Sequence, residues 1–148
     1  TRLLDMGVES YLIADATVGI IAQRLMRRLC PKCKRMRRML EHEMDYLEIP
    51  QEARQQASIC EPVGWQQCSG TGYYDRIGIY EIMEITPALR TMISRRCTTD
   101  ELREQALREG MHTLRQSARR LVLDGTTSLS EMQRISVEDQ NRLTEVTA

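Results

Sequence analysis

Residues 64–81 read Gly-Trp-Gln-Gln-Cys-Ser-Gly-Thr-Gly-Tyr-Tyr-Asp-Arg-Ile-Gly-Ile-Tyr-Glu, and this stretch indicates more about the fold than any other. Cys68 lies beside a glycine-rich turn that leads directly into an apolar run from Ile77 to Ile85. An apolar run bounded by turn residues is typical of a buried strand. The stretch therefore predicts a buried strand over 76–85 with a cysteine loop before it.

A second cysteine motif, Cys30-Pro31-Lys32-Cys33, lies upstream of this stretch. The Cys-x-x-Cys spacing lets two thiolates bind one cation and is the first half of a zinc knuckle. A closed structural zinc site needs four ligands, which a second Cys-x-x-Cys pair would complete. Here Cys68 stands alone, because Trp65 occupies the position three residues before it. We therefore predict Cys30, Cys33 and Cys68 as metal ligands, with Cys60 as a tentative fourth.

The cysteines have other interpretations as well. Cys60 and Cys97 fit the common role of a free cysteine as a small buried apolar residue, and His42 is a remoter candidate ligand than Cys60. A redox role for Cys30 and Cys33 needs a thioredoxin-type βαβ setting that the sequence does not indicate. The odd number of cysteines, five, and first residues without an export signal favour reduced thiols over disulfides.

The composition sets limits on function. A chain of 148 residues is long enough for one domain of ordinary size. Its 21 basic and 21 acidic residues cancel, so no global field argues for nucleic acid or a membrane surface as a partner. No run of about 18 apolar residues indicates a membrane span. Because the chain begins with Thr1 in an apparent helix, we expect it to be a C-terminal piece of something longer.

Eight of the 21 basic residues lie between Arg24 and Arg38. One interpretation is an anion or nucleic-acid patch, and the other is a solvated arm around a metal knuckle. No aromatic residues interleave the basic ones, so base stacking has no support and the second interpretation is favoured. The acidic residues expected to compensate the arm are Glu41, Glu43, Asp45, Glu48 and Glu52.

Periodicity and capping signals predict the remaining elements. They give a helix over 11–21 capped by Ser10, a strand over 23–29, and helices over 39–48 and 51–57. Thr86-Pro87 is a strong helix start, and Thr98-x-x-Glu101 is a capping box for a helix over 99–109. Two more helices, one ended by Gly125 and one capped by Ser128, complete a compact bundle in the C-terminal third.

The chain resembles a known family in five stretches that occur in unbroken order. They are Thr-Arg-Leu-Leu-Asp-Met-Gly-Val-Glu at 1–9, Ile-Ala-Gln-Arg-Leu-Met-Arg-Arg-Leu-Cys-Pro-Lys-Cys at 21–33, Thr-Gly-Tyr-Tyr-Asp-Arg-Ile-Gly-Ile-Tyr-Glu at 71–81, Gly-Met-His-Thr-Leu-Arg at 110–115 and Gly-Thr-Thr-Ser-Leu-Ser-Glu at 125–131. The chain is similar to the C-terminal part of the bacterial ATPases that drive type II secretion and type IV pilus assembly. The related pilus-retraction ATPases lack the cysteine insertion, which disfavours that branch.

The resemblance implies an α/β fold: the C-terminal portion of a RecA-like P-loop NTPase domain, with few strands and mostly helices, an inserted cysteine knuckle and a C-terminal helical bundle. It implies that the strands matching 22–29 and 76–84 belong to the central sheet of that domain. The implied divisions are 1–29 for the end of the RecA-like core, 30–72 for the zinc-type insertion, 73–95 for the return strand and helix of the core, 96–136 for the helical extension and 137–148 for a flexible tail.

The resemblance also implies a function. Members of the family form hexameric motors in the cytoplasm, peripheral to the bacterial inner membrane, and pass the work of ATP hydrolysis to polytopic platform proteins in that membrane. The implied partners are therefore neighbouring subunits of a homo-hexamer and the platform proteins, with no nucleic acid. Zinc is implied as a possible cofactor of this chain, and ATP and magnesium only as cofactors of the full-length protein.

The sequence departs from the family pattern in two places. The second cysteine pair of the family reads Gly-Cys-x-x-Cys, so Trp65 takes a ligand position, and Cys60 falls where an aromatic residue is usual. Asp75 replaces a glycine before Arg76, which makes the turn less tolerant of positive φ.

Catalysis by this chain alone is not expected. The sequence has no Gly-x-x-x-x-Gly-Lys-Ser/Thr, whose backbone and lysine would hold the phosphates of a nucleotide. Positioning and charge neutralisation are nearly all of phosphoryl-transfer catalysis, so the chain should be inactive by itself. The alternative function is a free-standing zinc-ribbon-like module that binds nucleic acid or protein.

Overall fold

The structure is a computed structural model that describes residues 2–136 of the chain. The predicted tail at 137–148 lies outside the described residues. The chain divides into two compact units. The first unit combines Thr1–Gln23 with Tyr80–Leu114, and the second combines Arg24–Ile79 with Arg115–Ala148. The described part is a mixed α/β structure with few strands and several helices, as expected.

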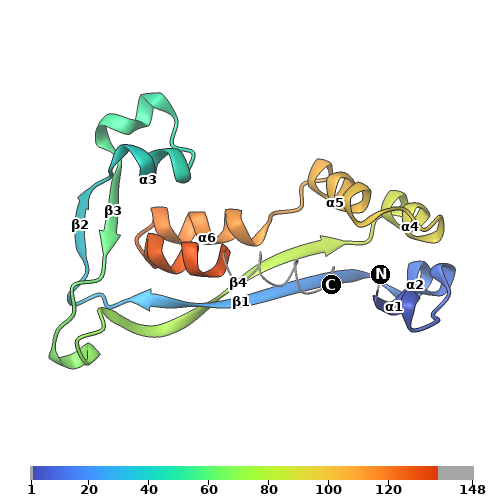
Figure 1. The fold of residues 1–148 in the computed structure, drawn as a ribbon, viewed down its shortest axis with the longest axis horizontal. Coiled ribbons are helices and arrows are strands. Elements are labelled where there is room, and N and C mark those ends of the chain that lie inside the picture. The colour runs from blue at the N-terminus through green and yellow to red at the C-terminus, as the bar shows by residue number, and fades with distance from the viewer. Residues whose placement is uncertain (1, 137–148) are drawn as a thin grey trace. The chain divides into compact units, whose positions relative to one another are not determined.

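Two long strands contribute one half to each unit. They are β1 (Gly19–Leu29) and β4 (Tyr73–Glu84), which form a two-stranded sheet (Figure 1). Ile85 donates its N–H to the carbonyl of Val18, and at the other end Cys30 donates to the carbonyl of Gly72. The two strands therefore run antiparallel, and one end of their pairing lies at the cysteine loop.

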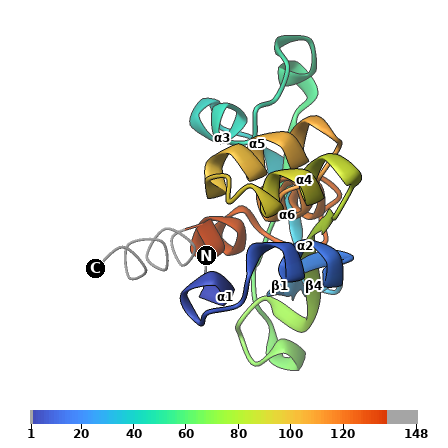
Figure 2. The same ribbon diagram turned by 90° about the vertical axis from the view of Figure 1, so that its right-hand side faces the viewer.

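The first unit is built from short helices packed beside its half of the sheet. They are α1 (Arg2–Asp5), α2 (Ser10–Ala16), α4 (Pro87–Ser94) and α5 (Thr99–Arg108), with α2 in contact with α4 (Figure 2). Ile85, Leu89 and Ala106 form its buried core. The predicted caps of two helices are confirmed, because Thr86 accepts the N–H of Leu89 and Thr98 that of Glu101.

The predicted helix over 11–21 is wrong at both ends. Helix α2 ends at Ala16, and the chain is already in strand β1 from Gly19. Glu9 is the N-cap residue, while the hydroxyl of Ser10 lies inside the helix and donates to the carbonyl of Ser94 at 3.0 Å. The β-branched residues after Ala16 favour extended backbone, and this preference overrides the helical spacing of the apolar positions.

The prediction of a buried strand over 76–85 is right in type and wrong in burial. Ile79 is 2% exposed, but Tyr80 is 46% exposed and Ile82 is 55% exposed. Apolar content shows that a strand is able to pack against other elements, and a sheet of two strands offers few neighbours to pack against.

The second unit carries a two-stranded sheet that the sequence did not predict. Strand β2 (Arg35–Arg38) pairs antiparallel with β3 (Ser58–Glu61), and Met36 lies opposite Cys60. Helix α3 (Glu41–Tyr46) and the 3-10 helix η1 (Gln51–Gln56) lie between the two strands in sequence, followed by a second 3-10 helix, η2 (Gln66–Cys68).

Helix α6 (Leu114–Leu123) and a helical segment at 129–136 complete the second unit. Ser128 accepts the N–H of Glu131 at 3.3 Å and caps the latter segment as predicted. Helix α5 belongs to the first unit and α6 to the second, so the described helices of the C-terminal third are shared between the units. The buried apolar residues of the second unit include Met26, Leu29, Leu47, Ile59, Ile79, Ala118, Val122, Met132 and Ile135.

Candidate metal centre

The first two cysteines lie in a turn that directly follows strand β1. The backbone N–H of Cys30 donates to the carbonyl of Gly72 at 2.9 Å, which fixes the start of the turn against the start of β4. The N–H groups of Cys33 and Lys34 both donate to the carbonyl of Cys30, at 3.3 and 3.0 Å. The chain therefore folds back after Pro31 and presents both thiols of the Cys-x-x-Cys motif on one side.

Cys68, the third cysteine, lies in a loop whose backbone requires glycine at two positions. A Cβ atom on Gly64 would lie 2.3 Å from the carbonyl oxygen of Gly70, and one on Gly72 would lie 2.4 Å from the Cβ of Pro62. Both glycines also have positive φ, 93° and 76°. The segments on either side of η2 are thus in direct backbone contact, and this contact holds Cys68 at the end of η2.

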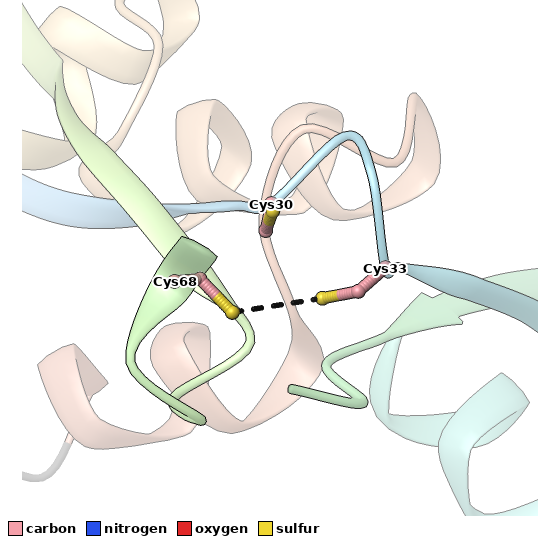
Figure 3. Close-up of side chains that lie close together, drawn as sticks. All are labelled: Cys30, Cys33 and Cys68. Atoms are coloured by element: carbon pink, nitrogen blue, oxygen red, sulfur yellow. Dashed lines mark hydrogen bonds between the residues drawn. The ribbon is translucent and has the colours of Figure 1, made fainter. Parts of the chain in front are cut away.

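The sulfur atoms of Cys30, Cys33 and Cys68 all lie within 4.8 Å of one another. Figure 3 shows the side chains of Cys33 and Cys68 pointing toward each other, with Cys30 beside them. The sulfurs of Cys33 and Cys68 are 3.9 Å apart. A tetrahedral zinc ion with Zn–S bonds of about 2.3 Å needs its sulfurs about 3.8 Å apart, so this spacing suits zinc. The three predicted cysteine ligands are brought together and could hold a metal ion.

Backbone N–H groups favour the thiolate form at this cluster. The sulfur of Cys68 accepts the N–H of Trp65 at 3.2 Å. Burial raises the pKa of Cys68, but the N–H groups of Trp65 and Gly72 and the neighbouring thiols lower it by more, so this thiol has a pKa below its usual value. Burial is the main cause that raises the pKa of Cys33 above its usual value. The two thiols are therefore unequal, and Cys68 is the better anion.

Cys60, the tentative fourth ligand, lies outside this group of three sulfurs. It is buried on β3, and its sulfur would be 2.9 Å from a Cβ atom on Gly125, so it packs closely against that glycine. Cys97 is in the first unit, just after α4. Among residues 2–136, no further His, Cys, Asp or Glu side chain joins Cys30, Cys33 and Cys68.

A buried carboxylate that the sequence analysis did not single out connects strand β1 to the helical segment at 129–136. Glu131 is 1% exposed and accepts hydrogen bonds from Arg27, at 3.0 Å from the backbone N–H and 2.6 Å from the guanidinium. Burial raises the pKa of Glu131, but the hydrogen bonds from Arg27 and Arg134 lower it below its usual value. The guanidinium of Arg27 also lies 4.1 Å from the ring centre of Tyr73.

Residues just before Glu131 also contact the turn that carries Cys30 and Cys33. Leu29, the residue before Cys30, donates its N–H to the carbonyl of Thr126 at 2.8 Å. The ammonium of Lys34 donates to the carbonyl of Gly125, also at 2.8 Å. The cysteine turn therefore rests on residues 125–131, where the sequence predicted a helix end at Gly125 and a cap at Ser128 but no contact with the cysteines.

Some basic residues of the stretch from Arg24 to Arg38 form ion pairs inside the second unit. Arg37 binds Glu43 at 2.6 Å and Glu61 at 2.7 Å, and the hydrogen bond from Arg37 is the main cause that lowers the pKa of Glu43 to about 2. The predicted compensation by Glu43 is therefore confirmed. Glu41 and Asp45 instead pair with Arg54, outside the basic stretch.

Comparison with known proteins places these features in one family. A family model described as "Type II/IV secretion system protein" matches residues 1–134. The type IV pilus assembly ATPase TfpB of Acinetobacter baylyi is 38% identical over 91% of this chain and 23% of its own length. PilB of Pseudomonas aeruginosa, also a type IV pilus assembly ATPase, is 38% identical over 92% of the chain and 24% of its own length. The type II secretion system protein E of Aeromonas hydrophila is 37% identical over 94% of the chain and 27% of its own length.

The chain thus spans about a quarter of the length of these relatives, 23 to 27%. In residues 2–136, no helix combines the length and the apolar content that crossing a membrane requires.

Proposed function

The chain belongs to the type II/IV secretion system protein family, and on that basis we propose that it is the C-terminal segment of a hexameric ATPase motor for type IV pilus assembly or type II secretion. The observation that carries the proposal is the match over residues 1–134 together with 34–40% identity to ATPases and E proteins of these systems. The motor works in the cytoplasm at the inner membrane, where its ring passes force to membrane platform proteins.

In this proposal the chain supplies structure and contacts, and ATP and magnesium bind to the rest of the full-length protein. The absence of a Gly-x-x-x-x-Gly-Lys-Ser/Thr motif supports this division, because the chain has no lysine-bearing phosphate loop. The exposed apolar side chains of β1 and β4, among them Ile21 and Ile82, suit strands that continue into a larger RecA-like sheet.

We propose zinc as the ion held by Cys30, Cys33 and Cys68, with the insertion over 30–72 closed at its base by the ion. Zinc bound there would supply a structural crosslink between thiolates that are far apart in the sequence. Cys30 follows β1, Cys33 precedes β2 and Cys68 precedes β4, so these three residues fix the entry and the exit of the insertion. A rigid base of this kind lets the insertion move with the strands that carry it.

The contacts of the basic stretch favour this function over a nucleic-acid module. Arg27 and Arg37 bind buried carboxylates, and Lys34 binds a backbone carbonyl. These three cations already bind groups of the protein itself, so the stretch is less suited to binding phosphates.

A segment exchange tests the motor proposal in vitro. In TfpB of Acinetobacter baylyi, the segment that matches this chain is replaced by residues 1–134. We expect the exchanged protein to assemble hexamers by native mass spectrometry and to hydrolyse ATP in the same range as TfpB. Monomers without ATP hydrolysis, from a protein that is folded by circular dichroism, would contradict the proposed place of this chain in the ring.

A further inference from the structure

The cysteine cluster supplies three donors to an ion that takes four. Structural zinc sites are closed by four protein ligands, whereas sites with three protein ligands keep the fourth position for water or another small molecule. The three sulfurs of Cys30, Cys33 and Cys68 lie close enough to bind one ion, and no other His, Cys, Asp or Glu of residues 2–136 reaches them.

The residue best placed to be the fourth ligand is unable to bind a cation. Trp65 is three residues before Cys68, but its indole N–H is only a hydrogen-bond donor. Its backbone N–H is already directed to the sulfur of Cys68 at 3.2 Å. Cys60 is held on β3 by the pairing with Met36 and lies against Gly125 instead.

One side of the cluster is open to solvent. Cys30 and Cys68 are buried, whereas Cys33 is only partly buried and Trp65 is 38% exposed. The backbone segments at Gly64 and Gly70 are in direct contact, so the loop leaves no room for a side chain at Gly64 itself. A small molecule from solution is therefore able to approach the position that Trp65 does not fill.

We propose that a divalent metal ion bound by Cys30, Cys33 and Cys68 keeps a fourth, exchangeable position that takes a small monodentate donor from solution. The inference rests on the metal site proposed above. Water fills the position by default, and an imidazole or a thiol displaces it; a thiol binds as the thiolate and gives its proton to solvent, with no change of oxidation state. The site would thus be a ligand-binding metal centre and not a closed structural knuckle.

Spectroscopy of the intact chain tests this directly. Zinc-loaded protein, kept reduced with a non-thiol reductant, is measured by X-ray absorption, and cobalt-substituted protein is titrated with imidazole and with 2-mercaptoethanol. We expect a zinc shell of three sulfurs and one oxygen or nitrogen. We also expect the visible bands of cobalt to shift saturably with each added ligand.

Two variants serve as matched controls. Trp65→Cys should give a shell of four sulfurs and lose the response to imidazole. Cys60→Ser should keep both the three-sulfur shell and the response, and it also serves if Trp65→Cys does not fold. A four-sulfur shell in the unaltered chain, or cobalt bands that ignore saturating imidazole, would overturn the exchangeable position while leaving the metal site intact. A chain that binds neither zinc nor cobalt would refute the metal site itself, and the exchangeable position with it.

Discussion

At the scale of single residues, the three clustered thiols and the two that lie apart differ in what surrounds them. Cys33 is one of three sulfurs within 4.8 Å, whereas Cys97 is similarly accessible but belongs to the other unit. Burial raises the pKa of both thiols, with the carboxylate of Glu101 adding to the rise at Cys97, so the two differ in their sulfur neighbours and not in the direction of the pKa shift. Substitutions of Cys33 and Cys97 therefore distinguish the loss of a metal ligand from the general effect of losing a thiol.

We predict that Cys33→Ser abolishes zinc binding and that Cys97→Ser does not. Elemental analysis and native mass spectrometry of the purified chain should give one zinc per chain for the unaltered protein and for Cys97→Ser, and none for Cys33→Ser. A chelator should lower the stability of the first two only, because the metal contributes free energy to the folded state. Equal zinc content in all three proteins would contradict the assignment of Cys33 as a ligand.

Glu43 should make the second unit sensitive to acid. Hydrogen bonds from Arg37 lower its folded-state pKa to about 2 from an ordinary 4.5, so the stability it adds is complete above about pH 5 and is lost as the pH falls toward 2. That shift corresponds to at most about 3 kcal/mol.

The measurement is urea unfolding of the unaltered chain and of Glu43→Gln between pH 6 and pH 3. The unaltered chain should lose more stability than the variant over this range. Parallel pH profiles would show that Glu43 does not carry this dependence.

At the scale of elements, the contact between residues 62–64 and 70–72 should decide whether the cysteine loop forms. Gly72 and Gly70 both have positive φ, but a Cβ at Gly72 would lie 2.4 Å from Pro62, whereas one at Gly70 would meet no atom within 4 Å. Both alanine variants carry the backbone penalty of about 1 kcal/mol. Gly72→Ala should cost a further ~1–3 kcal/mol through overpacking.

Chemical unfolding and zinc affinity should both rank Gly72→Ala below Gly70→Ala. The loss of zinc affinity follows because the carbonyl of Gly72 accepts the N–H of Cys30. If the two variants behave alike, the close contact in the loop does not hold the site.

The connection between β1 and the C-terminal helix should contribute more than a surface ion pair. Glu131 is buried and accepts four hydrogen bonds from Arg27 and Arg134 at 3.2 Å or less, whereas Glu104 and Arg108 form an exposed pair one helical turn apart. We expect Glu131→Ala to destabilise by about 1–3 kcal/mol, because it leaves the backbone N–H of Arg27 without its acceptor, while the half-exposed guanidinium of Arg27 is able to bind water. Glu104→Ala should change stability by less than about 1 kcal/mol.

Thermal and urea unfolding compare the two variants, and zinc content gives a second readout. Because residues 125–131 support the cysteine turn, Glu131→Ala should also weaken zinc binding. A small effect of Glu131→Ala, similar to that of Glu104→Ala, would show that this connection is dispensable.

Local chemistry made part of this structure predictable from the sequence. The Thr86 and Thr98 caps, the turn at Gly125 and the three clustered cysteines all depend on residues a few positions apart or on a known ligand spacing. The sheet of β2 and β3 escaped prediction because β2 is a four-residue strand with three arginines, which has no apolar alternation. The prediction of Cys60 as a fourth ligand failed to anticipate its position for a related cause. That position is set by the pairing of β3 with β2, where Cys60 lies opposite Met36, and the sequence did not reveal this pairing.

At the scale of the whole molecule, the features of the second unit form one connected arrangement. The cysteine turn after β1, the loop before β4 and residues 125–131 contact one another through backbone hydrogen bonds, and Glu131 binds the strand that leads into the turn. Three of the five stretches that carry the family resemblance, 21–33, 71–81 and 125–131, therefore also contribute to the candidate metal centre or its support. This coincidence supports a structural role of the centre within the proposed motor.

Pilus formation in cells tests the proposal that this chain serves as the C-terminal segment of a secretion or pilus motor. The measurement is the number of surface pili in an Acinetobacter baylyi strain without TfpB, supplied with TfpB in which the matching segment is residues 1–134 of this chain. We predict pili at a level comparable to the strain with TfpB itself, and a marked reduction when Cys30 and Cys33 are both changed to Ser. A stable exchanged protein that hydrolyses ATP but produces no pili would contradict the proposed role.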